Sequence, residues 1–490
     1  MFSEYVKVCS LYGAGFYYVP GTDICLKVGA YFRAEYAYGN IGGSLTNLDQ
    51  IGADGQRTRL TGGDNYQQRA RAFIFLDSRQ QTAYGTLRAY MNIGWTSDMP
   101  ASVGTSSAAL YANRAFIQLA GFTWGVATSY YDFYSSPATS YSVPWSSDTG
   151  DGGWKVAAYT AQLGNGVSAS LSFEEPRRQV VVNATVPNAY IVGALPVQDE
   201  LKVRFPDVVA NLRVDQAWGS AQIMGAVHDV GGGYYGATVG GGTCAAGVAG
   251  ASGNTCSGHP DQKLGFAVGA GIKVNFPMIG PGDYFQAQVN YTEGATRYAA
   301  LTPSGAGSVG IFGNGTGQGS TMGIGFFQDA VYCGASAAGA ATVACPFAGG
   351  SSVQLTTAWS VQAAYEHFWT PSLRTSLVGG YTDVSYNATA SNMICGNTTG
   401  AAGTISGLTN CGAGSFDFSH YSISSRTQWN ITKDFYVGLE GYYGHLNTMS
   451  KGQTLTYVAS AAGAQPTGLR TLDDQNVFVY RMRVHRDIVP

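Results

Sequence analysis

The stretch HYSISSRTQWNITKDFYVGLEGYYGHLN, residues 420–447, contains two arms in which polar and apolar residues alternate. The first arm puts apolar side chains such as Ile423 and Trp429 on one face and polar ones such as Arg426 on the other, and the alternation resumes after residues 432–434. Because successive side chains of a strand point to opposite faces, this stretch predicts a hairpin with one apolar and one polar face. Each arm has roughly eleven residues, about the length that a tilted strand needs to cross a bilayer.

The composition of the whole chain agrees with a membrane β-barrel. Only 12% of the 490 residues are charged, whereas the chain has 68 glycines and 32 tyrosines. It contains no run of about 18 apolar residues, so the sequence predicts no transmembrane helix. In a membrane barrel the lumen-facing residues dilute the apolar ones in this way. A large soluble β-sandwich, whose strands also alternate, is the competing fold.

The number and spacing of the other predicted strands favour an all-β, antiparallel, up-and-down barrel. We expect about sixteen strands, near residues 27–38, 66–78, 83–95, 111–120, 125–134, 153–163, 167–175, 207–217, 220–230, 262–275, 284–296, 353–369, 372–386, 420–432, 435–447 and 476–487. Short connections alternate with long ones, as expected for periplasmic turns and extracellular loops. Pairing of the first strand with the last would remove the free edges that lipid cannot satisfy.

The cysteines fall into local pairs. They are Cys9 with Cys25, Cys244 with Cys256, Cys333 with Cys345, and Cys395 with Cys411, and each pair encloses 11 or 15 residues. Their even number and loop placement favour disulfides in an oxidising compartment, with the pairing inferred from proximity alone. Metal binding is the alternative, but CxxC spacings are absent and the histidines do not cluster near the cysteines, so we expect no metal.

The two ends of the chain resemble a known family. The run CSLYGAGFYYVPGTDICLKVGAYFRAEY, residues 9–36, resembles the N-terminal signature of the alphaproteobacterial, rhizobial-type porins, and VFVYRMRVHRD, residues 477–487, has the same character. The resemblance implies a general diffusion porin of the bacterial outer membrane, a homotrimer, and a third loop folded into the pore. We expect residues 1–26 to form a periplasmic segment and residues 27–490 the transmembrane barrel, as a single domain overall.

Residues 1–4 have neither the basic start nor the apolar segment of a signal peptide. We therefore expect a trimmed chain or a misplaced start.

Charged residues inside the predicted strands lie opposite the apolar ones. In the first strand, for example, Arg33 and Glu35 fall on the face opposite Phe32. A charge that faces lipid at mid-depth costs roughly 2–4 kcal/mol, so this arrangement indicates a wet interior. The arginines that we expect to line this interior are Arg33, Arg69, Arg71, Arg88, Arg114, Arg481 and Arg483. The alternative is that they face solvent on an ordinary soluble sheet.

The third long loop, residues 135–152, contains Asp148 and Asp151 and follows Asp132. If it folds inward, as the resemblance implies, its acids would face the arginines across a narrow neck. Opposed charges there would tune ion selectivity and exclude bulky apolar solutes. These acids can also serve turn formation beside neighbouring glycines, a role compatible with the first.

The sequence contains no convincing catalytic constellation. HExxH is absent and the six histidines are scattered. Glu174-Glu175 beside Arg177-Arg178 is interpreted as a solvated loop edge rather than an acid–base pair. The glycine-rich run at 313–319 is interpreted as a flexible loop rather than a phosphate cradle. A net charge of −3 gives no sign of nucleic-acid binding.

We therefore expect a water-filled channel for passive diffusion of small hydrophilic solutes and ions, surrounded by outer-membrane lipid, without enzymatic activity or a cofactor. A solute-specific channel, or a surface receptor or adhesin that uses the long loops, is the alternative. Tyrosines and phenylalanines could supply an aromatic track for a specific channel, and the sequence does not place them. A soluble secreted β-rich enzyme is a third interpretation, but it lacks a nucleophile-and-base motif.

Overall fold

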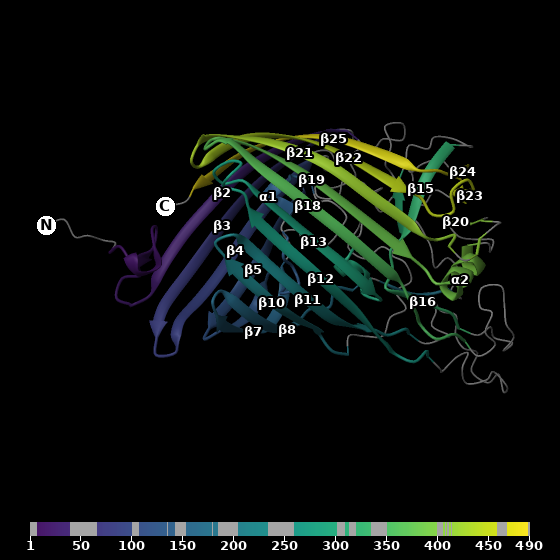
Figure 1. Ribbon diagram of the computed structural model, residues 1–490, viewed down its shortest axis with the longest axis horizontal. Coiled ribbons are helices and arrows are strands. Elements are labelled where there is room, and N and C mark those ends of the chain that lie inside the picture. Colours follow the sequence, from purple (N-terminus) through teal and green to yellow (C-terminus); the bar gives the residue numbers. More distant parts are fainter. Residues whose placement is uncertain are drawn as a thin grey trace.

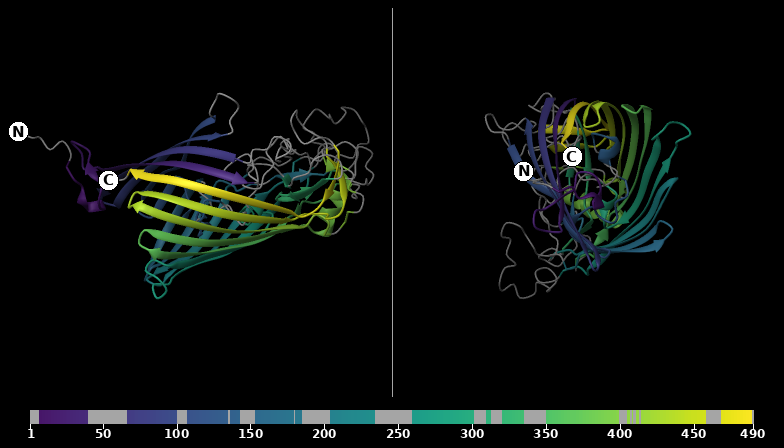
Figure 2. Two further views of the ribbon diagram at one scale, coloured as in Figure 1. Left: turned by 90° about the horizontal axis from the view of Figure 1, so that it is seen from above. Right: turned by 90° about the vertical axis from the view of Figure 1, so that its left-hand side faces the viewer.

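The chain forms a closed antiparallel β-barrel of sixteen strands, as the computed structural model shows (Figures 1 and 2). The barrel strands are β2 (Cys25–Gly39), β3 (Tyr66–Thr82), β4 (Gly85–Met99), β5 (Ser107–Leu119), β6 (Phe122–Ala127), β7 (Trp154–Gly164), β8 (Val167–Glu174), β10 (Asp207–Gln216), β11 (Gly219–Val230), β12 (Lys263–Asn275), β13 (Tyr284–Glu293), β18 (Thr357–Thr370), β19 (Leu373–Ser385), β21 (Phe418–Thr432), β22 (Phe435–Asn447) and β25 (Gln475–Ile488). Each strand pairs with the next along the wall, and β25 pairs with both β22 and β2, which closes the ring. The predicted fold class is confirmed.

The structure describes residues 7–39, 66–99, 107–134, 136–142, 153–178, 180–184, 204–233, 259–300, 309–312, 320–334, 350–398, 405–406, 408, 411–412, 414–457 and 468–488.

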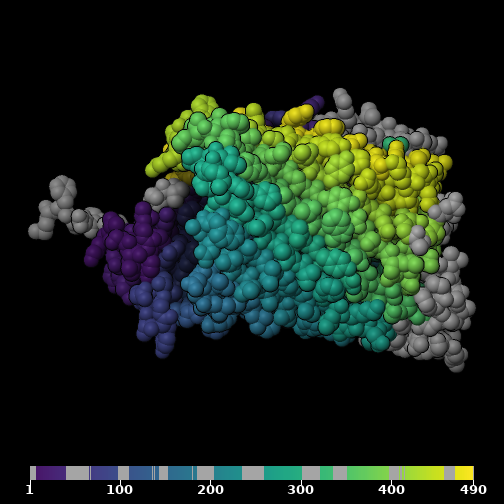
Figure 3. Space-filling view, in the orientation of Figure 1, coloured from purple at the N-terminus to yellow at the C-terminus, as the bar shows by residue number. Residues whose placement is uncertain are grey.

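The two faces of the wall have the polarity that the opening hairpin predicts. Ile423 and Trp429 are 49% and 55% exposed on the outside, whereas Ser424 and Arg426 are 5% and 2% exposed on the inside. Other barrel strands likewise expose apolar side chains on the outside, for example Phe32, Ile74 and Leu212. Figure 3 shows this closed outer wall from one side. Apolar side chains are thus exposed and polar ones buried, the reverse of a water-soluble protein, because lipid is the outer solvent.

The short turns lie at the end of the barrel that carries both termini (Figure 1). Ala120-Gly121 and Asn165-Gly166 have positive φ at both residues, as two-residue type I′ hairpin turns require. The longer turn between β12 and β13 is closed by Asp283. This carboxylate accepts hydrogen bonds from the Phe368 backbone N–H (2.9 Å) and the Tyr365 hydroxyl (2.7 Å), and it pairs with His367 Nδ1 (2.6 Å). Burial acts to raise the pKa of Asp283, but these bonds outweigh it and hold the pKa below its usual value.

The described parts of the long loops at the opposite end pack on one another. They contain two small sheets, β14 (Val309–Phe312), β15 (Ser320–Phe326), β24 (Gly468–Leu472), β23 (Thr454–Tyr457) and β20 (Ile405–Ser406) in one, and β17 (Gln354–Leu355), β16 (Ala330–Tyr332) and β9 (Val181–Asn183) in the other. Helix α2 (Ala388–Thr398) lies beside them (Figure 1). A buried apolar cluster that includes Ile324, Phe326, Met393 and Phe416 joins these elements, so this part of the loops is a packed cap with its own core. No helix in the described part of the chain is long and apolar enough to cross a membrane.

A small knob precedes the barrel, with a 3₁₀ turn η1 (Ser10–Tyr12) and strand β1 (Tyr17–Tyr18). The predicted disulfide between Cys9 and Cys25 is present and fastens the knob to the start of β2.

The other predicted disulfides concern the long loops. The bond between Cys395 and Cys411 is present and joins α2 to the loop that follows it. Cys333 is disulfide-bonded, but its expected partner Cys345 lies outside the described residues. Both Cys244 and Cys256 also lie outside the described residues, so the bond between them stays a prediction.

One predicted strand is wrong in its bounds. We expected a strand over residues 125–134, but β6 is Phe122–Ala127, and the chain leaves the wall after Ala127. The backbone N–H groups of Tyr130 and Tyr134 bind the side chains of Glu174 and Gln288 instead of a neighbouring strand. Side chains of the barrel interior therefore satisfy this segment and turn it inward.

Candidate functional site

Loop 3 is the segment of residues 128–153 between β6 and β7, and its described residues 128–134 and 136–142 lie inside the lumen. The Gln288 side-chain oxygen on β13 accepts hydrogen bonds from the backbone N–H groups of Phe133 (3.1 Å) and Tyr134 (2.9 Å). Gln222 Nε2 on β11 donates to the carbonyls of Tyr130 (3.3 Å) and Tyr131 (3.4 Å). The loop thus leaves its own strands and is held against β11 and β13, and it narrows the lumen there.

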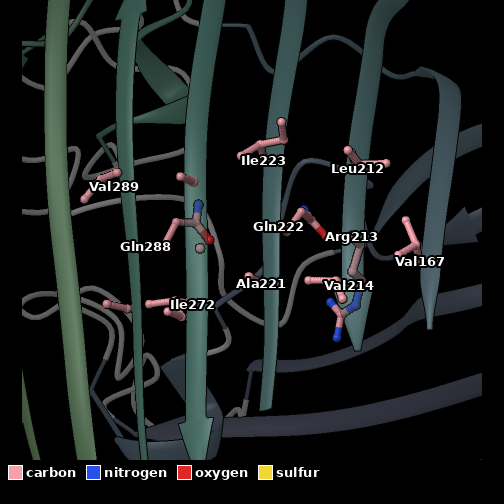
Figure 4. Close-up of a pocket in the computed structure, with 13 residues that line it drawn as sticks. Val167, Leu212, Arg213, Val214, Ala221, Gln222, Ile223, Ile272, Gln288 and Val289 are labelled. Atoms are coloured by element: carbon pink, nitrogen blue, oxygen red, sulfur yellow. The ribbon is translucent and has the colours of Figure 1, made fainter. Parts of the chain in front are cut away.

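Figure 4 shows the stretch of wall between β8 and β13 against which loop 3 packs from inside; on its lipid-facing side this stretch has an apolar hollow of about 540 Å³. Apolar Leu212, Ile223 and Val289 alternate there with polar Arg213, Gln222 and Gln288. The apolar three are about half exposed and the two glutamines are buried. The wall therefore offers apolar side chains to lipid and amides to the loop.

The middle of loop 3 includes the short helix α1 (Ser136–Thr139), and the residues after it are fastened to β22 and β25. Glu440 Oε2 accepts hydrogen bonds from the Ser140 hydroxyl (2.9 Å) and from the Tyr141 backbone N–H (2.6 Å). Arg481 Nη1 donates to the Tyr141 carbonyl at 2.7 Å, and the Arg483 guanidinium lies 3.9 Å from the centroid of the Tyr141 ring. A carboxylate and two guanidinium groups thus hold one tyrosine of the loop against the wall.

Inside the loop, the Tyr134 hydroxyl and Thr139 Oγ1 lie 3.0 Å apart across α1. Burial raises the pKa of Tyr134 to about 12, so this phenol stays neutral.

The start of loop 3 is fixed by buried charges near the cap. Asp132 forms an ion pair with Arg177 (2.8 Å). The Arg177 guanidinium also lies over the rings of Trp154 (4.9 Å) and Tyr298 (4.6 Å), and its backbone N–H donates to Asp207. Our interpretation of residues 174–178 as a solvated loop edge is wrong, because Glu174 and Arg177 are both 1% exposed. Their burial follows from pairing with loop 3, which the local sequence does not reveal.

The predicted arginines gather on one side of the lumen, on β2, β3 and β25. Arg33 and Arg71 are directly opposite each other in the β2–β3 register, and Arg69 is opposite Glu35. Arg483 Nε donates to Glu35 at 2.8 Å, while Arg33 Nε is 3.6 Å from the same carboxylate. Since Arg481 and Arg483 are buried beneath loop 3, these two hold the loop.

Two further predicted residues lie on the neighbouring strands. Arg88 pairs with Asp77 on β3 (2.9 Å), near the end with the short turns. The backbone N–H of Arg114 on β5 donates to the Asn92 side chain at 2.9 Å. Asp148 and Asp151 lie outside the described residues. That these residues set the constriction stays a prediction.

The residues that position loop 3 were not predicted from the sequence. Glu440 is the one carboxylate on the polar face of residues 435–447, the second arm of the opening hairpin. The sequence therefore did offer a signal for this residue. Gln288 and Tyr141 carry no such signal, because their partners are far away in sequence. Among the described residues, no group of three or more histidine, cysteine, aspartate and glutamate side chains could hold a metal ion. Loop 3 and the charged wall beside it can pass, retard or select solutes by the width and the charge of the lumen.

Comparisons with known proteins agree on one class. The family model described as "Porin subfamily" matches residues 3–477. The putative outer membrane protein y4fJ of Sinorhizobium fredii is 31% identical over 129 residues, which cover 26% of this chain and 34% of that protein. Porin Omp2b of Brucella melitensis is 28% identical over 225 residues, 44% of this chain and 55% of the relative. The chain thus spans less than two thirds of either relative.

Among solved structures, the outer membrane channel DcaP of Acinetobacter baumannii has a similar fold. The TM-score is 0.56 at 12% sequence identity, and the match covers 96% of this chain and 99% of that one.

Proposed function

We propose, from the premise that this chain belongs to the porin subfamily, that its barrel is a water-filled channel for passive diffusion of small hydrophilic solutes and ions. The chain is a protein of the bacterial outer membrane. Diffusion down a gradient needs only a polar lumen of suitable width, so no cofactor is required and no catalytic step takes place.

The observation that carries this proposal is a closed wall with an apolar outside, a polar inside and a loop fastened across the lumen. Sixteen strands enclose enough space for an aqueous channel. Loop 3 then narrows that space, so that width and charge at the neck decide which solutes pass.

In this proposal, Arg33, Arg69 and Arg71 give one side of the constriction a positive charge. Among the described side chains of β2, β3 and β25, Arg33, Arg69 and Arg483 share Glu35, so arginines outnumber carboxylates there. We expect a preference for anions over cations, weakened at high salt because screening shortens the reach of these charges.

A planar lipid bilayer tests the channel directly. The purified chain should give discrete conductance steps in KCl, and the reversal potential in a salt gradient should have the sign of anion preference. A chain that passes no current after reconstitution, although its barrel resists unfolding in detergent, contradicts the proposal.

We also propose a homotrimer, the assembly that the family resemblance implies. Unheated electrophoresis and light scattering in detergent should give three copies per particle. A mass of one copy under conditions that retain conductance contradicts this assembly.

A further inference from the structure

A row of aromatic side chains lines the lumen beside the arginines. Tyr31 on β2, Phe73 on β3 and Tyr111 on β5 lie on the inner face. Their sequence neighbours Phe32 and Ile74 are 53% and 55% exposed on the outer face, so alternation sends Tyr31 and Phe73 inward. These rings occupy positions at which a simple water-filled pore needs only polar residues.

The rings form a continuous surface. The centroids of Tyr31 and Phe73 are 5.0 Å apart with an angle of 5° between their planes, and those of Phe73 and Tyr111 are 5.9 Å apart. Tyr31 also lies 4.8 Å from the ring of His485, which is 4.7 Å from that of Tyr436. The surface therefore extends across β22, β25, β2, β3 and β5.

Two inward-facing glycines let the rings lie against the wall. A Cβ atom on Gly94 would lie 2.5 Å from Tyr111 Cζ and 2.6 Å from Phe73 Cε2. A Cβ atom on Gly29 would overlap the ring of Phe75, which belongs to a second row of rings. The rings thus cover the glycine backbone, and Tyr31 and Tyr111 remain partly exposed on the lumen side.

Two cationic side chains border this surface, and their charge is only partly matched. The Arg33 Cζ atom is 5.5 Å from the Tyr31 centroid, and the Arg71 Cζ atom is 5.6 Å from the Tyr111 centroid. Arg71 Nε donates to Thr96 at 3.0 Å, and within the described part of the chain it has no carboxylate partner. Arg33 Nε lies 3.6 Å from the Glu35 carboxylate, which Arg483 also binds, and it is buried without a hydrogen bond.

Like charges directly opposite each other on neighbouring strands are unfavourable. Arg33 and Arg71 are such a pair. An anion bound between them would relieve this repulsion and accept hydrogen bonds from both guanidinium groups.

We propose that Arg33, Arg71 and the rings of Tyr31, Phe73 and Tyr111, here called the aromatic–arginine subsite, bind small anions that carry a flat ring, such as aromatic carboxylates. The inference rests on the proposed channel function and names a solute class for it. The carboxylate binds the two guanidinium groups, and the ring of the solute stacks on the wall beside them. If the rings only cover the glycines, no preference for aromatic solutes results.

Block of single-channel current in planar bilayers tests the subsite with three probes: benzoate, cyclohexanecarboxylate and benzyl alcohol. The first two share charge and approximate size but differ in the flat ring, whereas the third has the ring without the charge. We expect benzoate to bind roughly 2- to 10-fold more tightly than cyclohexanecarboxylate, the range expected for one aromatic stacking contact. Benzyl alcohol should bind at least roughly tenfold more weakly than benzoate.

Variants assign the effect to residues. Tyr111→Leu should remove the benzoate preference while leaving the affinity for cyclohexanecarboxylate unchanged, and Arg71→Gln should weaken both anions together. Phe32→Leu, on the outer face of the same wall, is the matched control and should behave as the unmodified chain. Phe73→Leu serves as a second ring variant where Tyr111→Leu does not assemble.

The outcomes separate the subsite from the channel itself. Equal block by benzoate and cyclohexanecarboxylate, with normal conductance in KCl, overturns the subsite and leaves the channel intact. A benzoate preference that persists in both ring variants also overturns it. Loss of KCl conductance in the unmodified chain overturns the channel function instead.

Discussion

Glu440 is the residue whose removal should change loop 3 most. Its carboxylate oxygen accepts two hydrogen bonds from the loop, one from the Ser140 hydroxyl and one from the Tyr141 backbone. Hydrogen bonds to a charged group contribute roughly 1.5–3 kcal/mol each, so Glu440→Ala should remove roughly 3–6 kcal/mol of the attachment. That range corresponds to a factor of roughly 10² to 10⁴ in the equilibrium ratio between the attached and the detached state of the loop 3 tip, residues 139–142.

The start of loop 3 keeps its contacts in this variant, because Gln288 still binds the backbone N–H groups of Phe133 and Tyr134. We therefore expect the tip, residues 139–142, to detach while the start of the loop stays in place. The neck should widen and fluctuate without collapse of the barrel.

Single-channel recording in roughly 1 M KCl reads the width, because the Debye length there is about 3 Å and charge effects are small. Glu440→Ala should raise the mean conductance and the open-channel noise, and Glu440→Gln, which keeps one acceptor oxygen, should lie between it and the unmodified chain. Glu293→Gln is the matched control, since that carboxylate accepts a hydrogen bond from the Tyr291 hydroxyl and holds none of the described residues of loop 3. Unchanged conductance and noise in Glu440→Ala would refute the reasoning.

Three further predictions follow from other parts of the molecule. Replacement of Arg69 and Arg71 by glutamine should shift the reversal potential toward cations, and an unchanged potential would count against their role at the neck. Asp283→Asn should lower barrel stability at neutral pH by roughly 1–3 kcal/mol, measured by denaturant unfolding in detergent. Because the folded pKa of Asp283 is depressed, its stabilisation is present above the unfolded value of about 3.9 and is lost as pH falls through the folded pKa. The variant should therefore lose the part of the acid dependence below about pH 4 that this group supplies, and identical acid profiles for the two chains would contradict the assignment. The paired change of Cys395 and Cys411 to serine should loosen α2 by up to about 3 kcal/mol, seen as faster proteolytic cleavage there with unchanged conductance; equal cleavage rates would mean that packing alone holds the helix.

The barrel wall was predictable because its signal is local. Alternation along a hairpin such as residues 420–447 fixes which side chains face lipid, and alternating short and long connections fix the up-and-down topology. The path of loop 3 was not predictable in the same way. Gln288 is 154 residues from the Tyr134 backbone that it binds, and Glu440 is 299 residues from Tyr141, so the partners share no sequence pattern.

The aromatic–arginine subsite also escaped the sequence analysis, for a different reason. Tyr31 and Phe73 are apolar residues on the wet face, where the alternating pattern expects polar ones. Departures from a local rule without structural need often mark a functional surface. The sequence shows the departure but does not show that rings from β2, β3 and β5 meet.

The seam between β2 and β25 makes the barrel dependent on its last strand. Glu35 and Arg483 face each other across this seam although 448 residues separate them, and they hold it together with a charged hydrogen bond. Until β25 arrives, both β2 and β22 present unpaired peptide groups, which a hydrocarbon environment cannot accommodate. A nascent copy must therefore be kept out of the membrane, or its open flanks shielded by a helper, until β25 has been made and has paired with both neighbours.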